Sequence, residues 1–155
     1  MLDPIRNASF KRDRKTSPPN SQCYPHTRRP IINKFKAWAL ANILKNPHCH
    51  IKWLYGYVGC GKSAIAQTLA EEINELGKLA GSFFFFRIGD ERSRIAKLPA
   101  TLAFQMSISV PGTEPWIRKA ITDDPTLLTP DDCSLQERMK SLVYDPFVRA
   151  ASSPD

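Results

Sequence analysis

Hydrophobic positions recur at helical spacing in the middle of the chain and again toward its C-terminal end. Ile65, Leu69, Ile73 and Leu76 lie three or four residues apart, which predicts an amphipathic helix that begins near Lys62. Gly77 follows where a helix C-terminus is usually capped. The same reasoning predicts further helices over residues 27–44, with Thr27 as N-cap, over 99–110 and 115–121, and after a capping box of Ser134 and Glu137.

Two apolar runs read as strands instead. Ile51–Tyr55 precedes the helix that begins near Lys62, and Leu79–Phe86 follows it. The second run contains four consecutive phenylalanines, so its two faces do not alternate, which is typical of a central parallel strand covered on both sides. The predicted fold class is therefore α/β, with a parallel sheet flanked by helices in a three-layer αβα arrangement.

The segment between the first predicted strand and the helix contains the clearest candidate binding motif. Gly56–Ser63 fits the pattern G-x-x-x-x-G-K-[ST] of a phosphate-binding loop. The glycines let the backbone N–H groups surround a phosphate, and the helix N-terminus adds the positive end of its dipole. Lys62 is expected to reach the β- and γ-phosphates, and the Ser63 hydroxyl to bind Mg²⁺. The predicted site for ATP or GTP consists of Gly56, Tyr57, Val58, Gly59, Cys60, Gly61, Lys62, Ser63 and Ala64.

Charge is concentrated at the N-terminus. The 155-residue chain has a net charge of +7, and residues 1–30 hold seven basic against two acidic residues, a net +5. Residues 1–22 are polar and broken by Pro18-Pro19, which predicts a disordered basic arm. The run Lys11–Lys15 could bind nucleic acid or act as a nuclear signal, although no aromatic residue lies within it to stack on bases.

Cellular location follows from composition. The four cysteines are widely spaced, which indicates a reducing compartment, and no apolar run approaches the length of a membrane span. We therefore expect a cytoplasmic protein without a membrane anchor, with a nuclear location as the alternative through the basic arm.

The order of these pieces resembles the NACHT-type NTPase domain of fungal signalling ATPases of the STAND class, including the nephrocystin-type N-terminal variant. The residues that carry the resemblance are 23–28, 53–70, 81–85, 99–105, Asp124-Pro125 and 142–146. It covers residues 23–148, between the arm of residues 1–22 and a polar tail over 149–155. The resemblance implies a nucleotide-binding switch in which exchange of ADP for ATP drives assembly, with Thr27 and Arg28 near the nucleotide.

One element of the family pattern is missing. The Walker B strand, an apolar strand that ends in aspartate, is expected after Asp145, and the chain ends first, so we expect a fragment of the domain. No catalytic residue is assigned, and hydrolysis is doubtful without that acid. An autonomous small NTPase or kinase that uses Asp145 or Asp90 is the alternative. Because the later strands would also be missing, we expect a partner or a further copy of the chain to complete the sheet.

Overall fold

The computed structural model describes residues 2–12, 22–41, 51–86 and 94–152. It divides into two compact units: unit 1 contains Met1–Arg12 and Ala80–Asp155, and unit 2 contains Asp13–Leu79. These boundaries differ from the expected arm, domain and tail, because the first residues of the chain belong to the same unit as its C-terminal half. Each unit is described by itself.

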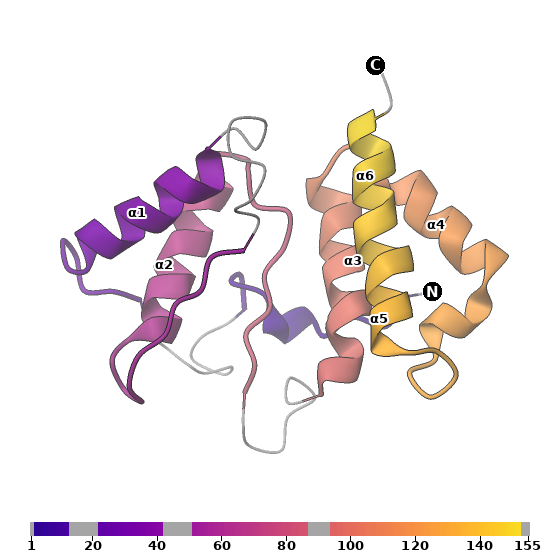
Figure 1. Ribbon diagram of the computed structural model, residues 1–155, viewed down its shortest axis with the longest axis horizontal. Coiled ribbons are helices and arrows are strands. Elements are labelled where there is room, and N and C mark those ends of the chain that lie inside the picture. The colour runs from indigo at the N-terminus through magenta and orange to yellow at the C-terminus, as the bar shows by residue number, and fades with distance from the viewer. Residues whose placement is uncertain (1, 13–21, 42–50, 87–93, 153–155) are drawn as a thin grey trace. The chain divides into compact units, whose positions relative to one another are not determined.

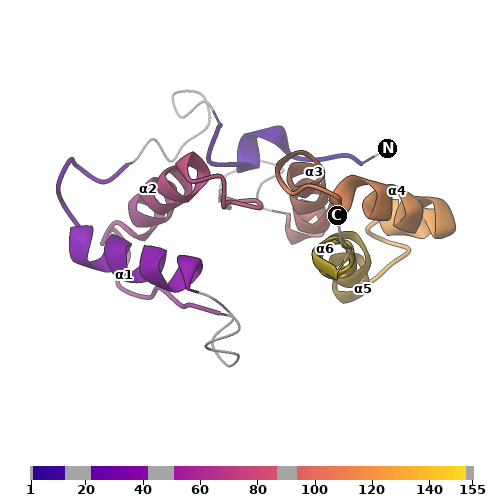
Figure 2. The same cartoon turned by 90° about the horizontal axis from the view of Figure 1, so that it is seen from above.

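Unit 2 is built on two helices that pack against each other, α1 (Arg29–Leu40) and α2 (Lys62–Glu75) (Figures 1 and 2). Ile32 of α1 is completely buried, and Ile65 and Ile73 of α2 are nearly so. Both helices were predicted from the apolar spacing, and both are present. The predicted N-cap of the first is wrong, because the Thr27 hydroxyl donates to the carbonyl of Tyr24 instead of capping α1.

The end of α2 follows the sequence prediction closely. Gly77 has a φ of 65°, in the left-handed region that favours glycine, and its N–H donates to the carbonyl of Asn74. The N–H of Lys78 donates to the carbonyl of Ile73, which completes a Schellman motif. Two carbonyls that the helix leaves unpaired are thereby satisfied, and the helix stops here.

A carboxylate joins the two helices of unit 2. Glu72 of α2 pairs with Arg29 of α1, and its second oxygen lies 2.9 Å from the ammonium of Lys36, about two turns further along the same face of α1. The hydrogen bond from Lys36, followed by the one from Arg29, lowers the pKa of Glu72 below its usual 4.5. The folded state therefore favours the charged carboxylate more than the unfolded chain does.

We expect Glu72→Gln to lower the stability of unit 2 at neutral pH by about 0.5–1 kcal/mol, the range of partly exposed ion pairs. The contribution of Glu72 is fully present above the usual pKa of 4.5 and is lost as the pH falls through the lowered pKa of the folded state. The difference between wild type and variant in urea denaturation should therefore shrink in acid. Equal differences at neutral and strongly acidic pH would show that this ion pair contributes nothing.

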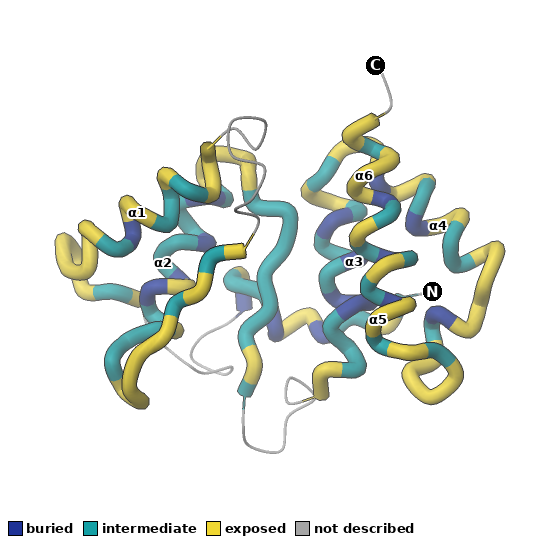
Figure 3. Tube along the Cα trace, viewed as in Figure 1, coloured by how far each residue is buried: buried dark blue, intermediate teal, exposed yellow. Residues whose placement is uncertain are grey.

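Unit 1 is a group of helices around one apolar cluster. Its elements are η4 (Ile95–Lys97), α3 (Leu98–Ser109), α4 (Thr113–Asp123), η5 (Pro125–Leu128), α5 (Leu135–Met139), the π-helical η6 (Lys140–Tyr144) and α6 (Asp145–Ser152). The buried cluster consists of Ala103, Met106, Ile117, Leu127 and Leu142 (Figure 3). The predicted helices over 99–110 and 115–121 are α3 and α4.

The predicted last helix is also present, and it is longer than expected. The Ser134 hydroxyl accepts the N–H of Glu137 at 3.1 Å, as the capping box predicts. Helical structure then continues through η6 and α6 to Ser152, so residues 149–152 are helical where a polar tail was expected. The guanidinium of Arg149 lies 5.0 Å from the ring centroid of Trp116 on α4, which ties this end of the chain to unit 1.

The predicted α/β fold is wrong, because no strand and no sheet occur among the described residues. A strand in a sheet forms backbone hydrogen bonds with a neighbouring strand, whereas the run Leu79–Phe86 forms hydrogen bonds with other groups. The side-chain amide of Gln105 on α3 accepts the N–H of Ser82 at 3.0 Å and donates to its carbonyl at 2.9 Å, which takes the place of a neighbouring strand. Phe85 is 54% exposed, so this run is not a central strand covered on both faces.

The N-terminal residues differ from a disordered arm. Residues 2–12 contain a short turn of helix, η1 (Arg6–Ala8), with Ile5 and Ala8 buried. The N–H of Ile5 donates to the Thr101 hydroxyl on α3 at 3.0 Å, and the N–H of Phe84 donates to the Ala8 carbonyl at 2.7 Å. These bonds hold the segment to unit 1. The rest of the predicted arm, residues 13–21, lies outside the described residues.

Candidate phosphate-binding loop

The candidate site is the turn of unit 2 that leads into α2. The N–H of Cys60 donates to the carbonyl of Tyr57 at 3.3 Å, which closes the turn. Gly59 and Gly61 have φ values of 82° and 89°, a conformation that side chains with a Cβ strongly disfavour. At Gly56 an added Cβ would lie 2.9 Å from the sulfur of Cys60, so the close approach of these two residues also requires glycine. The glycines predicted from the motif are therefore needed by the geometry.

The N-terminus of α2 opens directly from this turn. Gly61 is the N-cap, no side chain caps the helix, and the N–H of Ile65 makes the first helical bond, to the carbonyl of Gly61 at 2.9 Å. The N–H groups of the first turn before Ile65 thus have no partner within the helix. The first turn also contains no acidic residue that would occupy them or repel an anion. Such an end attracts negative charge.

Lys62 folds back over the loop. Its ammonium donates to the carbonyls of Gly56 and Tyr57, both at 2.8 Å, and lies 3.8 Å from the sulfur of Cys60. The side chain therefore spans the turn from the helix to the opposite side of the loop. This places a positive charge at the carbonyls of Gly56 and Tyr57, at the start of the loop.

Solvent reaches most of the loop. Tyr57 and Val58 are at least 90% exposed, and Gly59 and Ser63 are also exposed, whereas Cys60, Gly61, Lys62 and Ala64 are half-buried. Ser63 is the second residue of α2, so its hydroxyl lies beside the unpaired N–H groups. The nine residues named from the motif are consecutive, and they occupy this turn and the first turn of α2.

The other residues considered from sequence lie elsewhere. Thr27 and Arg28 are exposed at the start of α1, and no contact between them and the loop is recorded among the described residues. Asp145 is the first residue of α6, follows the π-helical turn, and lies 3.9 Å from the ammonium of Lys140. Its neighbour Leu142 is part of the buried helical cluster, so Asp145 does not end a strand. Asp90 lies outside the described residues.

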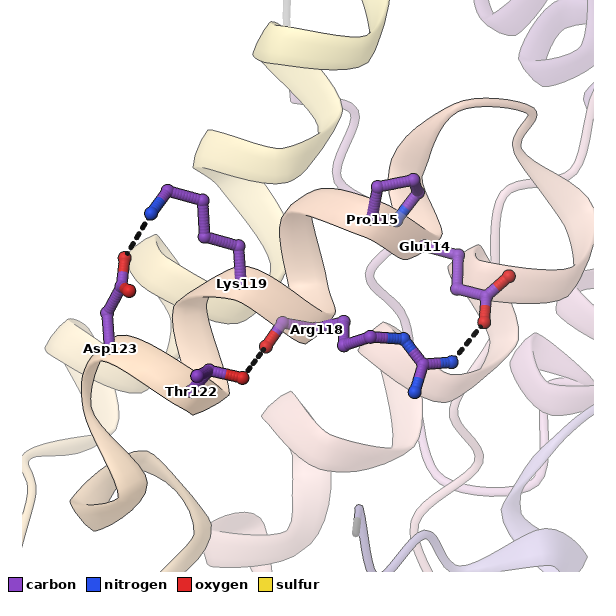
Figure 4. A pocket seen from close by; sticks show the side chains of 6 residues that line it. All are labelled: Glu114, Pro115, Arg118, Lys119, Thr122 and Asp123. Atoms are coloured by element: carbon purple, nitrogen blue, oxygen red, sulfur yellow. Dashed lines mark hydrogen bonds and ion pairs between the residues drawn. The ribbon is translucent and has the colours of Figure 1, made fainter.

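A depression on α4 was not suggested by the sequence. It has a volume of about 510 Å³ and is lined by Glu114, Pro115, Arg118, Lys119, Thr122 and Asp123 (Figure 4). Its charges already pair along the helix: Arg118 with Glu114 at 2.6 Å, and Lys119 with Asp123 at 2.9 Å. The four-residue spacing is the sequence signal for such pairs. The depression is explained as the solvated face of α4.

In the described part of the chain, no group of three or more His, Cys, Asp or Glu side chains is placed to hold a metal ion. The helices described there are all too short or too polar to cross a bilayer.

Comparison with known proteins gives a family. The family described as "Nephrocystin 3, N-terminal" matches residues 31–151, which include the candidate loop and most of both units. No curated protein and no solved structure matches the chain. Because the family match covers well over half of the sequence, the chain belongs to the nephrocystin 3 N-terminal family.

Proposed function

We propose that this chain binds the phosphates of a nucleoside triphosphate, ATP or GTP, together with Mg²⁺ through Gly56–Ala64. The main support for the proposal is the position of Lys62, whose ammonium donates to the carbonyls of Gly56 and Tyr57 in the loop. In this position the ammonium can exchange two carbonyl contacts for contacts to phosphate oxygens without a change in the helix. Charge-assisted bonds to an anion are the stronger kind, so a phosphate competes well for the lysine.

The N-terminus of α2 supplies further donors for the phosphates. Its unpaired N–H groups and the absence of acidic residues in its first turn favour an anion at the same place. Backbone donors bind phosphate oxygens and make no contact with the base, so this geometry accepts ATP and GTP alike.

Ser63 is the residue that would hold Mg²⁺. Its hydroxyl is exposed on the first turn of α2, beside the phosphate position. Mg²⁺ commonly keeps several waters and takes only one or two protein oxygens plus the substrate phosphates, so one hydroxyl is an adequate protein contribution. The ion would neutralise part of the phosphate charge.

We propose nucleotide binding without hydrolysis. Phosphoryl transfer requires a group that positions the attacking water as well as charge stabilisation. Asp145 begins a helix of unit 1 and has Lys140 as its neighbour, so no observation assigns it to the loop. We therefore propose a nucleotide-binding module of a NACHT-type signalling switch, supported by the loop and by membership of the nephrocystin 3 N-terminal family.

Nucleic acid binding has less support. Arg12 of the basic run is only 5% exposed, and its guanidinium lies 4.2 Å from the ring centroid of Phe84, so it serves the packing of unit 1. A cytoplasmic location remains a prediction from the sequence.

A phosphate series tests the proposed class of ligand. In calorimetric titrations with Mg²⁺ present, ATP and GTP should bind most tightly, ADP less tightly, and AMP more weakly by at least about tenfold, because each lost phosphate removes charge-assisted contacts. Ser63→Ala should reduce the gain in ATP affinity that Mg²⁺ provides. Tighter binding of AMP or adenosine than of ATP would mean that the base is recognised and the loop is not the binding site.

A further inference from the structure

The first residues of the chain lie against unit 1, although they are far from the rest of it in sequence. The chain leaves unit 1 after Arg12, passes through unit 2, and returns to unit 1 only at Ala80. Residues 2–12, drawn in indigo in Figure 1, are therefore held by non-covalent contacts and by a long connection through unit 2. We refer to residues 2–12 as the strap. Its attachment to unit 1 is that of a bound peptide.

The strap lies in a groove whose first wall is formed by α3 and its N-cap residue, Lys97. The Thr101 hydroxyl accepts the N–H of Ile5 at 3.0 Å, in a buried hydrogen bond. The ammonium of Lys97 pairs with the carboxylate of Asp3. Ile5 is only 6% exposed. This wall thus recognises a negative charge and a backbone N–H, and an aliphatic side chain is buried where that N–H binds.

Residues 80–86 form the second wall of the groove. The N–H of Phe84 donates to the carbonyl of Ala8 at 2.7 Å. The hydroxyl of Ser82 accepts the N–H of Phe10 at 3.0 Å. Ala8 is completely buried, so the groove leaves room for a small side chain only at this position. Backbone groups of the strap thus find partners on this wall, as they do in peptides that bind along an extended segment.

The strap is separate from the hydrophobic core of unit 1. The buried cluster that includes Ala103 and Leu142 contains neither Ile5 nor Ala8. Leu2 packs against this cluster from outside, as a partly buried residue. The helices of unit 1 therefore keep their central contacts when the strap is displaced from the groove.

We propose that the groove between α3 and residues 80–86 is a docking site for a segment of another protein, and that the strap occupies this site as an intramolecular ligand. The groove selects an acidic residue for Lys97, an aliphatic residue two positions later, and a small residue three positions after that. An arginine four positions further adds a contact, because the guanidinium of Arg12 lies 4.2 Å from the ring centroid of Phe84. A segment with this pattern binds by displacing the strap.

Another protein fits this site better than a second copy of the chain does. Exchange of straps between two copies replaces each contact with an identical one, so no contact is gained. Each strap is also tethered to its own unit 1, which gives it a high effective concentration at its own groove. A segment of another protein can make further contacts outside the groove, and these contacts can outweigh the tether.

The test measures the binding of a fluorescent peptide with the sequence of residues 2–12 to the full chain, by fluorescence polarisation. In the wild type the affinity is reduced by the fraction of chains whose groove is open. Asp3→Ala combined with Ile5→Asp should release the strap at constant net charge, because the pair with Lys97 is lost and a charge is placed at a buried position. This double variant should bind the peptide about tenfold more tightly than wild type, or better.

Three controls make the result specific to the groove. Thr101→Val, added to the double variant, should weaken peptide binding by about tenfold, because a buried N–H of the peptide loses its acceptor. Thr122→Val is the same change at an exposed position of α4 and should leave the affinity unchanged. A peptide that carries Ala8→Leu should not bind, because Ala8 has no room for a larger side chain.

Three outcomes would each overturn the proposal. The first is equal affinity of wild type and the double variant for the peptide, or no binding to either. The second is loss of the helical spectrum in the double variant, since the strap would then be needed for unit 1 to fold. The third is dimerisation of the wild type that the double substitution abolishes, which would assign the groove to a second copy.

Discussion

Lys62→Ala should weaken binding of Mg-ATP by about 10–100-fold. The ammonium lies 2.8 Å from each of two loop carbonyls, and Lys62 itself is the first residue of α2. A hydrogen bond to a charged group contributes about 1.5–3 kcal/mol, and every 1.4 kcal/mol changes affinity about tenfold. The loss should appear in the dissociation constant from calorimetry, with the helical spectrum unchanged.

Lys78→Ala is the matched control for this substitution. Lys78 is an exposed lysine at the other end of α2, and only its backbone N–H takes part in the helix cap. Removing its side chain changes the net charge by the same amount and should leave affinity within about twofold, because surface charges are screened beyond roughly 10 Å. Equal losses in both variants would attribute binding to overall positive charge and not to the loop.

Arg138→Ala should destabilise unit 1 by about 2–4 kcal/mol. Arg138 is 2% exposed, and its guanidinium donates to the carbonyl of Leu127 in η5 at 2.9 Å and to that of Ala96 in η4 at 2.6 Å. Burial lowers the pKa of Arg138, so the charge carries a desolvation cost that the substitution relieves. Two lost bonds to a charged group and the cavity left behind outweigh that relief. Urea denaturation measures the difference.

Arg118→Ala provides the comparison for the buried arginine. Arg118 lies on α4 with its side chain 75% exposed and pairs with Glu114 at four-residue spacing. Such pairs contribute about 0.3–0.5 kcal/mol, so the midpoint of denaturation should hardly move. If Arg138→Ala also left the midpoint of denaturation unchanged, the packing of η4, η5 and α5 would not depend on the Arg138 guanidinium.

Local signals predicted much of the helical structure. The apolar spacing of Ile65 and Ile73, the glycine after α2, and the N-cap at Ser134 each act within a few residues, and each is present in the structure. The conformation of the loop is equally local, because Gly59 and Gly61 need positive φ whatever lies around them. The glycine conformations of the loop and the start of α2 at Lys62 were therefore predictable from the sequence, whereas phosphate binding by the loop stays a prediction.

Pairing between distant segments was not predictable. The run of phenylalanines has the composition of a strand, but Ser82 bonds to the side chain of Gln105, 23 residues away, and Phe84 bonds to Ala8. The bond between Ile5 and Thr101 spans 96 positions and gives order to a segment whose composition suggests none. Arg138 would be expected at the surface, and only the carbonyls that converge on it explain its burial.

The most direct test of the central claim is amide NMR of the full chain titrated with Mg-ATP. The account predicts that the amide signals of Gly59–Ala64 shift and saturate at one nucleotide per chain, and that the corresponding signals of Lys62→Ala barely move. Absence of any shift, or shifts confined to the helices of unit 1, would show that the loop does not bind nucleotide.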